Sequence, residues 1–189
     1  MTRNTREDVV EAAGRLFAEK GYHGTSMRDL GKELGLLGSS LYSHIDTKQE
    51  LLVEVVERGA ALFQASADRA LSTEGSGADR LQVFIAGHID VVLDHVDEAR
   101  TFLNEARSLD RSYRRRIIAA RDRYETALRG LLETGRTDGS FGASLDTKLT
   151  GIFILSILNA VDRWFHEPGV INRAALVEEI YAFAAGGIR

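Results

Sequence analysis

The sequence predicts an all-α protein of about nine helices. Apolar residues recur at the three- and four-residue spacing of an amphipathic helix along most of the 189 residues. The chain holds a single proline, which favours long uninterrupted helices. No segment shows the alternating pattern of a strand. Apolar residues make up 44% and charged residues 28%, which is typical of a globular chain with a real core.

Several protein classes are disfavoured by composition. The absence of cysteine excludes disulfides, thiolate metal sites and cysteine nucleophiles. The first residues, "MTRNTREDVVEAA", hold no apolar core of a signal peptide. The longest apolar stretch, residues 151–161, is shorter than the ~20 residues that span a bilayer. We therefore expect a cytoplasmic protein.

Two short helices are expected first, over about residues 5–20 and 26–34. Thr5 followed by Asp8, and Ser26 followed by Asp29, are capping-box starts. Gly21 would end the first helix and a turn beginning with Gly35 would end the second.

A third short helix, over about residues 39–45, completes a helix-turn-helix, whose second helix enters the major groove of DNA. Leu41 and Ile45 would anchor it to Met27, Leu30 and Leu34. Small residues at its start give the slim edge that a groove ~12 Å wide admits. Helix N-termini offer free N–H groups to phosphates. On this arrangement we expect DNA contacts from Thr25, Ser26, Gly38, Ser39, Ser40, Tyr42, His44 and Lys48.

Charge counts against a nucleic-acid binder. The net charge is −4, and residues 1–50 hold seven Lys or Arg against eight Asp or Glu. Helix-turn-helix shapes also occur in proteins that never meet DNA. Any DNA contact must therefore rest on a few well-placed groups.

The rest of the chain continues as helices. Thr47 with Glu50 is a third capping box, which begins a long helix over 47–71. "STEGSG" (72–77) and "GRTDGSFGAS" (135–144) read as loops. The segment 145–165 is apolar nearly all round, which indicates a buried or interface helix. The remaining helices are expected from residue 78, over 99–108, 112–134 and 172–185.

The stretch "TSMRDLGKELGLLGSSLYSHIDTKQELL" (25–52), led in by "LFAEKGYHGTS", resembles the N-terminal domain of the TetR family of transcriptional regulators. Ile45 stands where the family usually has Phe, and Leu37 where it often has Ser or Thr. The resemblance implies an N-terminal arm supplied by Arg3 and Arg6. It also implies DNA contacts from the residues matching Thr25, Arg28, Ser39, Ser40, Tyr42, His44 and Lys48.

The resemblance further implies two domains with different functions. Residues 1–47 would form the DNA-binding domain, with the helix 47–71 as connector. Residues 48–189 would bind a small molecule and dimerise through 145–165 and 172–185. The protein would be a homodimeric repressor on double-stranded operator DNA, released by its ligand through a population shift.

"LNEARSLDRSYRRRIIAARDRYETALRGLLETGRTDGSF", "AVDRWF…PG" and "FAAGGI" are similar to one subgroup, which regulates degradation of steroid rings, fatty acids or aromatic acids. Several of its members respond to acyl-CoA esters, which need an apolar tunnel with a cationic mouth. Asn159, inside an apolar helix, is the most informative candidate, and Arg163 would be a dimer contact or a pocket wall. The candidate ligand residues are Phe84, His88, Leu103, Arg107, Ile117, Arg121, Tyr124, Leu155, Asn159 and Arg163.

Alternatives remain open at this point. The apolar candidates are equally explained as core, and the arginines of 111–123 as a solvated face. A multidrug or antibiotic sensor is the second choice within the family. A small α-helical enzyme is a different class, but no catalytic motif supports it. A pure protein-interaction module is a third. His88, Asp90, Asp94 and His95 lack the spacing of a metal site, so we expect neither metal nor cofactor.

Overall fold

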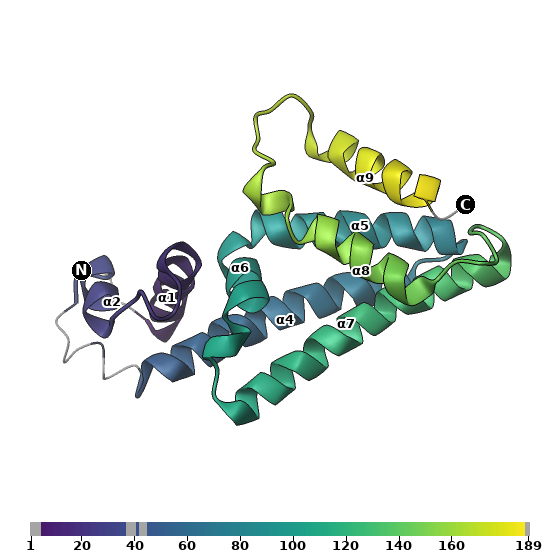
Figure 1. Cartoon of the computed structure of the whole chain (residues 1–189). Coiled ribbons are helices and arrows are strands. Elements are labelled where there is room, and N and C mark those ends of the chain that lie inside the picture. Colours follow the sequence, from purple (N-terminus) through teal and green to yellow (C-terminus); the bar gives the residue numbers. More distant parts are fainter. Residues whose placement is uncertain (1–4, 37–40, 42–44, 188–189) are drawn as a thin grey trace. The chain divides into compact units, whose positions relative to one another are not determined.

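The computed structural model describes residues 5–36, 41 and 45–187, and within them it is all-α, as predicted (Figure 1). No strand occurs among these residues. None of the helices in the described part of the chain is both long and apolar enough to cross a membrane. The elements are α1 (Arg6–Lys20), α2 (Met27–Glu33), α4 (Lys48–Ser72), α5 (Gly77–Asp94), α6 (Val96–Asn104), the 3-10 helix η1 (Glu105–Ser108), α7 (Arg111–Asp138), α8 (Thr147–Leu158), the 3-10 helix η2 (Val161–Arg163) and α9 (Arg173–Gly187).

The chain folds into two compact units. Unit 1 comprises Met1–Ala61 and His95–Ala119, and unit 2 comprises Leu62–Asp94 and Ala120–Arg189. Helices α4 and α7 each contribute residues to both units. The boundary near residue 47 divides the predicted DNA-binding domain from the predicted ligand-binding domain. It is defined by function and not by compactness, and it stays a prediction.

The predicted helix starts are present. Thr5 and Asp8 form a full capping box at α1, and Ser26 and Asp29 form another at α2. At α4 the box is only half made. The Thr47 hydroxyl accepts the N–H of Glu50 at 3.1 Å, but the Glu50 carboxylate accepts from the N–H of Asp46 instead.

In unit 1, α1 contacts both α2 and α6. Leu30, Leu41 and Ile45 are buried, as the predicted anchoring requires. Helix α6 packs against α1, and it also lies close to α4. A Cβ atom built on Gly59 would stand 2.6 Å from the carbonyl oxygen of Glu98, so only glycine fits this crossing.

Unit 2 is organised around α5, which contacts α8, η2 and α9 (Figure 1). The start of α5 meets the end of α7 at two glycines. A Cβ built on Gly77 would lie 2.3 Å from the Cα of Gly135. The N–H of Gly77 donates to the carboxylate of Asp138 at 2.7 Å, which fixes this junction.

Three predicted boundaries were wrong. The expected helix 145–165 ends at Leu158, because the backbone turns at Asn159 and tightens into η2. The expected loop 135–144 begins only after Asp138, since α7 continues through Gly135 to make the junction with α5. The helix expected over 99–108 is α6 followed by η1.

Candidate DNA-binding and effector sites

Thr25 lies in the turn before α2, and its side chain serves the fold. Its hydroxyl donates to the carbonyl oxygens of Leu16 and Gly21, at 3.1 and 3.0 Å, and the residue is only 2% exposed. The hydroxyl thus satisfies carbonyl groups at the end of α1. It is directed into the domain and not toward solvent.

Lys48 is tied to the same turn. Its ammonium donates to the carbonyl oxygens of Tyr22 and Thr25, both at 2.7 Å, and lies 3.9 Å from the centre of the Tyr22 ring. Burial lowers the pKa of Lys48, and the charge of Glu105 acts the other way. An ammonium has three donors, so one remains for a phosphate oxygen.

The other described candidates are exposed. Ser26 and Arg28 lie on the surface at the start of α2. Arg6 is exposed as well, but its guanidinium pairs with Glu50 and Glu54, which raise its pKa. The remaining DNA candidates lie outside the described residues; they are Arg3, Gly38, Ser39, Ser40, Tyr42 and His44.

A buried polar cluster lies in unit 2. His88 Nδ1, on α5, is 3.0 Å from the hydroxyl of Tyr124, on α7, and both side chains are buried. The His88 ring lies 4.9 Å from the Phe63 ring, and the Tyr124 ring 4.9 Å from the Phe84 ring, measured between centroids. The Ser66 hydroxyl donates to the carbonyl oxygen of Phe63 at 2.8 Å.

Burial controls the ionisation of this cluster. Because a charged imidazole loses its hydration here, the pKa of His88 falls to about 3, and Asn159 acts in the opposite direction. Burial likewise raises the pKa of Tyr124. Both groups are therefore neutral at physiological pH.

The structure brings together only some of the predicted ligand residues. Phe84, His88, Tyr124 and Asn159 form or border the cluster. Leu155 and Asn159 are half-buried on α8 and at its end, and Arg163 is exposed. Leu103, Arg107 and Ile117 belong to unit 1, where Leu103 is half-buried, Arg107 exposed and Ile117 buried.

The arginines at the start of α7 differ from one another. Arg114 donates to the carbonyl oxygen of Leu109 at 3.0 Å, and Arg116 pairs with Glu57 at 2.6 Å. Arg111, Arg115 and Arg123 are exposed. Arg121 is half-buried, and burial lowers its pKa. Some arginines of residues 111–123 therefore bind groups of the protein itself, and others are exposed to solvent.

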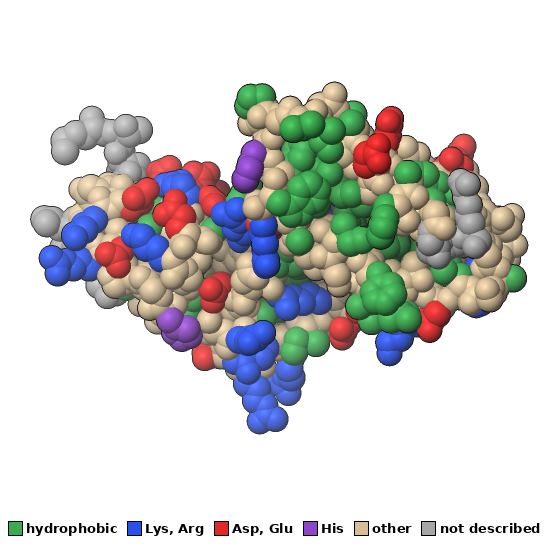
Figure 2. All heavy atoms as spheres, turned by 45° about the horizontal axis from the view of Figure 1, so that its top comes forward, with side chains coloured by type: hydrophobic (Ala, Val, Ile, Leu, Met, Phe, Trp, Pro, Cys, Tyr) green, Lys and Arg blue, Asp and Glu red, His purple; other side chains and the backbone are tan. Residues whose placement is uncertain are grey.

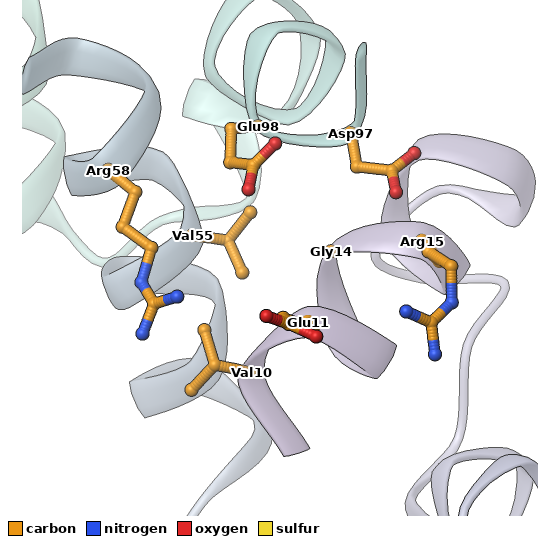
Figure 3. A pocket seen from close by; sticks show the side chains of 8 residues that line it. All are labelled: Val10, Glu11, Gly14, Arg15, Val55, Arg58, Asp97 and Glu98. Carbon is orange, nitrogen blue, oxygen red and sulfur yellow. The ribbon is translucent and has the colours of Figure 1, made fainter. Parts of the chain in front are cut away.

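Sequence reasoning missed a pocket of about 200 Å³ in unit 1 between α1, α4 and α6 (Figure 3). Burial and the neighbouring Glu98 raise the pKa of Asp97 there. Gly14, in the middle of α1, is the one lining residue whose type could have indicated this site from the sequence. A glycine inside a helix often marks close packing against a neighbouring element. The lining residues are Val10, Glu11, Gly14, Arg15, Val55, Arg58, Asp97 and Glu98.

Two of the acidic residues considered for a metal have another role. The guanidinium of Arg173, at the start of α9, pairs with both oxygens of Asp94 at 2.7 Å and with Asp90 at 3.3 Å. These bonds attach α9 to the end of α5.

Comparison with known proteins agrees with this arrangement. Residues 9–55 match the family described as "Bacterial regulatory proteins, tetR family", and residues 74–188 match the "Tetracyclin repressor-like, C-terminal domain". The HTH-type transcriptional repressor KstR2 of Mycobacterium tuberculosis is 28% identical over 97% of this chain and 92% of its own.

Solved structures show the same fold. The TetR family regulator PfmR from Thermus thermophilus is 31% identical, with a TM-score of 0.84 over 96% of this chain and 98% of that one. AibR in complex with isovaleryl coenzyme A and operator DNA is 22% identical, with a TM-score of 0.85 over 94% and 96%. The chain belongs to the TetR family of bacterial regulatory proteins, and is a DNA-binding transcriptional regulator and not an enzyme.

Proposed function

We propose that this regulator is a homodimeric repressor that acts in the cytoplasm and leaves its operator when a small ligand binds. The observation that carries the proposal is the pairing of a helix-turn-helix unit with a C-terminal domain of the tetracycline-repressor type. The KstR2 relatives are named transcriptional repressors, which supports repression here. The regulator FasR, 21% identical, is named an activator. Repression and activation are therefore distinguished by measuring transcription from the operator with and without this protein.

DNA contact is proposed for the predicted helix 39–45 and its surroundings, with Arg28 as an exposed partner for phosphates. For Ser26 this contact requires exchange of the hydrogen bond that its hydroxyl donates to Asp29 at 2.5 Å. Lys48 has one donor left for the same task. Thr25 contributes by holding the turn before α2 and not through its hydroxyl. Arg3 and Arg6 are proposed as the arm, which for Arg6 requires exchange of its pairs with Glu50 and Glu54.

Arg28→Ala tests this interface by electrophoretic retardation on a selected operator at several salt concentrations. A lost phosphate contact weakens binding and reduces the salt slope by about one. Arg136→Ala is the matched control, because Arg136 is also exposed but lies in unit 2. Equal binding by both variants would remove Arg28 from the interface.

The proposed ligand is an acyl-CoA ester or a related lipid or acid metabolite. AibR, of the same fold, was solved with isovaleryl coenzyme A. A relative in Bacillus subtilis, 20% identical, is named a fatty acid metabolism regulator. In unit 2 the His88–Tyr124 cluster supplies a few polar atoms among apolar helices, which is the usual composition of such a site. A multidrug or antibiotic sensor is the alternative.

Dimerisation is proposed through 145–165 and 172–185. Large apolar side chains are exposed there, with Phe153 on α8 at 58% and Phe183 on α9 at 73%. Figure 2 shows hydrophobic side chains gathered on this part of unit 2. Exposed apolar patches of this kind mark association surfaces. Others on these segments are Leu149, Ile152 and Trp164.

The oligomeric state tests this surface directly. Phe153→Glu should convert a dimer to a monomer in size-exclusion chromatography with light scattering, since a charge cannot be buried unpaired. Leu71→Glu is the control, because Leu71 is also an exposed apolar residue of unit 2 but belongs to α4 and not to these two segments. Dissociation by both variants, or by neither, would contradict the assignment.

A further inference from the structure

Positive charge is concentrated where η1 meets α7. Residues 107–116 hold five arginines and one acidic residue, although the net charge of the chain is −4. Arg114 and Arg116 bind groups of the protein itself. The other three are exposed and make no ion pair within the part of the chain that the structure describes. We call these three the arginine cluster: Arg107, Arg111 and Arg115.

The backbone that carries the arginine cluster is held in place by hydrogen bonds. The Arg114 guanidinium donates to the carbonyl oxygens of Arg107 and Leu109, at 2.5 and 3.0 Å, which closes the turn between η1 and α7. The Leu109 side chain is buried. Arg111 and Arg115 lie four residues apart on one face of α7, about 6 Å along its axis. Three exposed cations thus project from one short, well-fixed stretch of chain.

The same stretch is bonded to the turn that precedes α2. The carboxylate of Glu105, in η1, accepts the N–H of Tyr22 at 3.2 Å and the hydroxyl of Ser108 at 2.8 Å. Lys48, at the start of α4, donates to the carbonyl oxygen of Tyr22 at 2.7 Å. Because η1 and the Lys48 ammonium meet at one residue, and Arg107 follows Glu105 by two positions, the arginine cluster begins close to a proposed phosphate contact. All of these residues belong to unit 1.

We propose that the arginine cluster binds backbone phosphates of the DNA that flanks the operator, beyond the base pairs that the helix-turn-helix reads. Guanidinium groups pair closely with phosphate oxygens, and contacts to the DNA backbone carry no sequence information of their own. The cluster also supplies positive charge that residues 1–50 lack, since they hold seven Lys or Arg against eight Asp or Glu. This inference rests on the proposed DNA interface, because it extends that interface along unit 1.

The expected effect follows from the salt dependence of DNA binding. The logarithm of the binding constant falls with the logarithm of the salt concentration, by about 0.9 for each phosphate contact. Between 1 M and 0.1 M salt, one contact therefore contributes roughly eightfold in affinity. We expect at least one such contact for each protomer bound. Flanking DNA should thus raise the affinity roughly tenfold and steepen the salt slope by about one.

Fluorescence anisotropy of the full-length protein on two labelled duplexes measures this gain. One duplex is an operator selected from random sequences and trimmed to the selected base pairs. The other carries in addition one helical turn of DNA, about 10 base pairs, on each side. Two unrelated flank sequences should give the same gain, because phosphates and not bases are bound. Equal affinity for the trimmed and the extended duplex would overturn the inference.

Variants assign the gain to the arginine cluster. The alanine variant, Arg107→Ala with Arg111→Ala and Arg115→Ala, should lose the flank gain and still bind the trimmed duplex. Replacing the same three residues by lysine should retain most of the gain, since lysine keeps the charge. The matched control removes three exposed arginines of α7 that belong to unit 2, and it should retain the gain. A gain that the alanine variant keeps, or that the control also loses, would overturn the inference. The control substitutions are Arg123→Ala, Arg129→Ala and Arg136→Ala.

Uncharged flanks give a test that depends on no variant. Methylphosphonate linkages placed only in the flanks remove their phosphate charge, so the unmodified protein should bind this duplex no more tightly than the trimmed one. Undiminished binding would overturn the inference.

The two duplexes also tell failure of this inference from failure of the proposed DNA interface. Binding to the trimmed operator without a flank gain overturns the inference alone, whereas binding to neither duplex overturns the interface as well. Absence of a flank gain together with weaker binding of coenzyme A esters by the alanine variant would assign the arginine cluster to the effector instead.

Discussion

The buried His88 makes a quantitative prediction about stability and pH. Its pKa in the folded protein is about 3, because burial penalises the charged ring, whereas an unfolded chain has a pKa near 6.5. The stabilisation is fully present above the unfolded pKa and is lost as the pH falls toward the folded one. Replacing His88 by glutamine removes this dependence, since glutamine does not titrate.

The magnitude follows from proton binding by the unfolded chain. Between about pH 7.5 and about pH 5.5 the unfolded imidazole becomes mostly protonated, while the buried ring stays neutral. Integration over this interval gives a loss of about 1.4 kcal/mol from His88 alone. The carboxylates that also titrate are common to both proteins and cancel in the comparison.

Urea unfolding followed by circular dichroism at the two pH values measures the effect. The free energy of unfolding of the unmodified protein should fall by about 1.4 kcal/mol more than that of His88→Gln. His166→Gln, which removes an exposed imidazole from unit 2, is the control for the loss of one histidine. An equal fall in the unmodified protein and His88→Gln would refute the argument, because it would mean that the folded protein protonates His88. If His88→Gln does not fold, a ¹⁵N titration of His88 in the unmodified protein decides the same question.

Three further predictions concern the fold. Gly59→Ala should lower the free energy of unfolding by about 1–3 kcal/mol in urea, because its Cβ would stand 2.6 Å from the carbonyl oxygen of Glu98; an unchanged midpoint would show that α4 and α6 do not meet there. Thr25→Val should cost about 1–2 kcal/mol through loss of the hydrogen bond to Leu16, and unaltered stability with weakened DNA binding would instead make its hydroxyl a DNA contact. Arg173→Gln should lower thermal stability by about 1 kcal/mol or less, since its ion pairs at the start of α9 are partly solvated, and a larger loss by calorimetry would contradict that estimate.

Local features of the fold were predictable from sequence because they depend on neighbouring residues. The capping boxes of Thr5 and Ser26 need only a carboxylate three residues on, and both are present. Gly21 and Gly35 follow the ends of α1 and α2 with φ of 73° and 64°. Glycine adopts such positive φ angles readily, so the residue type alone predicts that a helix ends there. The end of α7 at Asp138 was missed, because a tertiary bond to Gly77 decides it.

The site was less predictable, because its contacts join residues distant in sequence. His88 and Tyr124 were proposed as apolar pocket wall, and no spacing rule joins positions 36 residues apart into one polar cluster. Thr25 was proposed to face DNA, but carbonyl groups of the preceding helix end take its hydroxyl. The direction in which the Thr25 side chain points depends on how the turn after α1 folds back onto the end of that helix. A pattern of residue types does not give this direction.

This DNA-binding regulator is proposed to have an operator affinity that a small ligand controls. The most direct test is fluorescence anisotropy of the full-length protein on DNA upstream of its own gene and on operators selected from random duplexes, at fixed salt, with and without acyl-CoA esters. We expect tight, sequence-specific binding that one class of ester abolishes. Tight binding that no ester alters would retain the regulator and reject the ligand class in favour of drugs or free acids. No preference for any selected duplex over random DNA would contradict the claim itself.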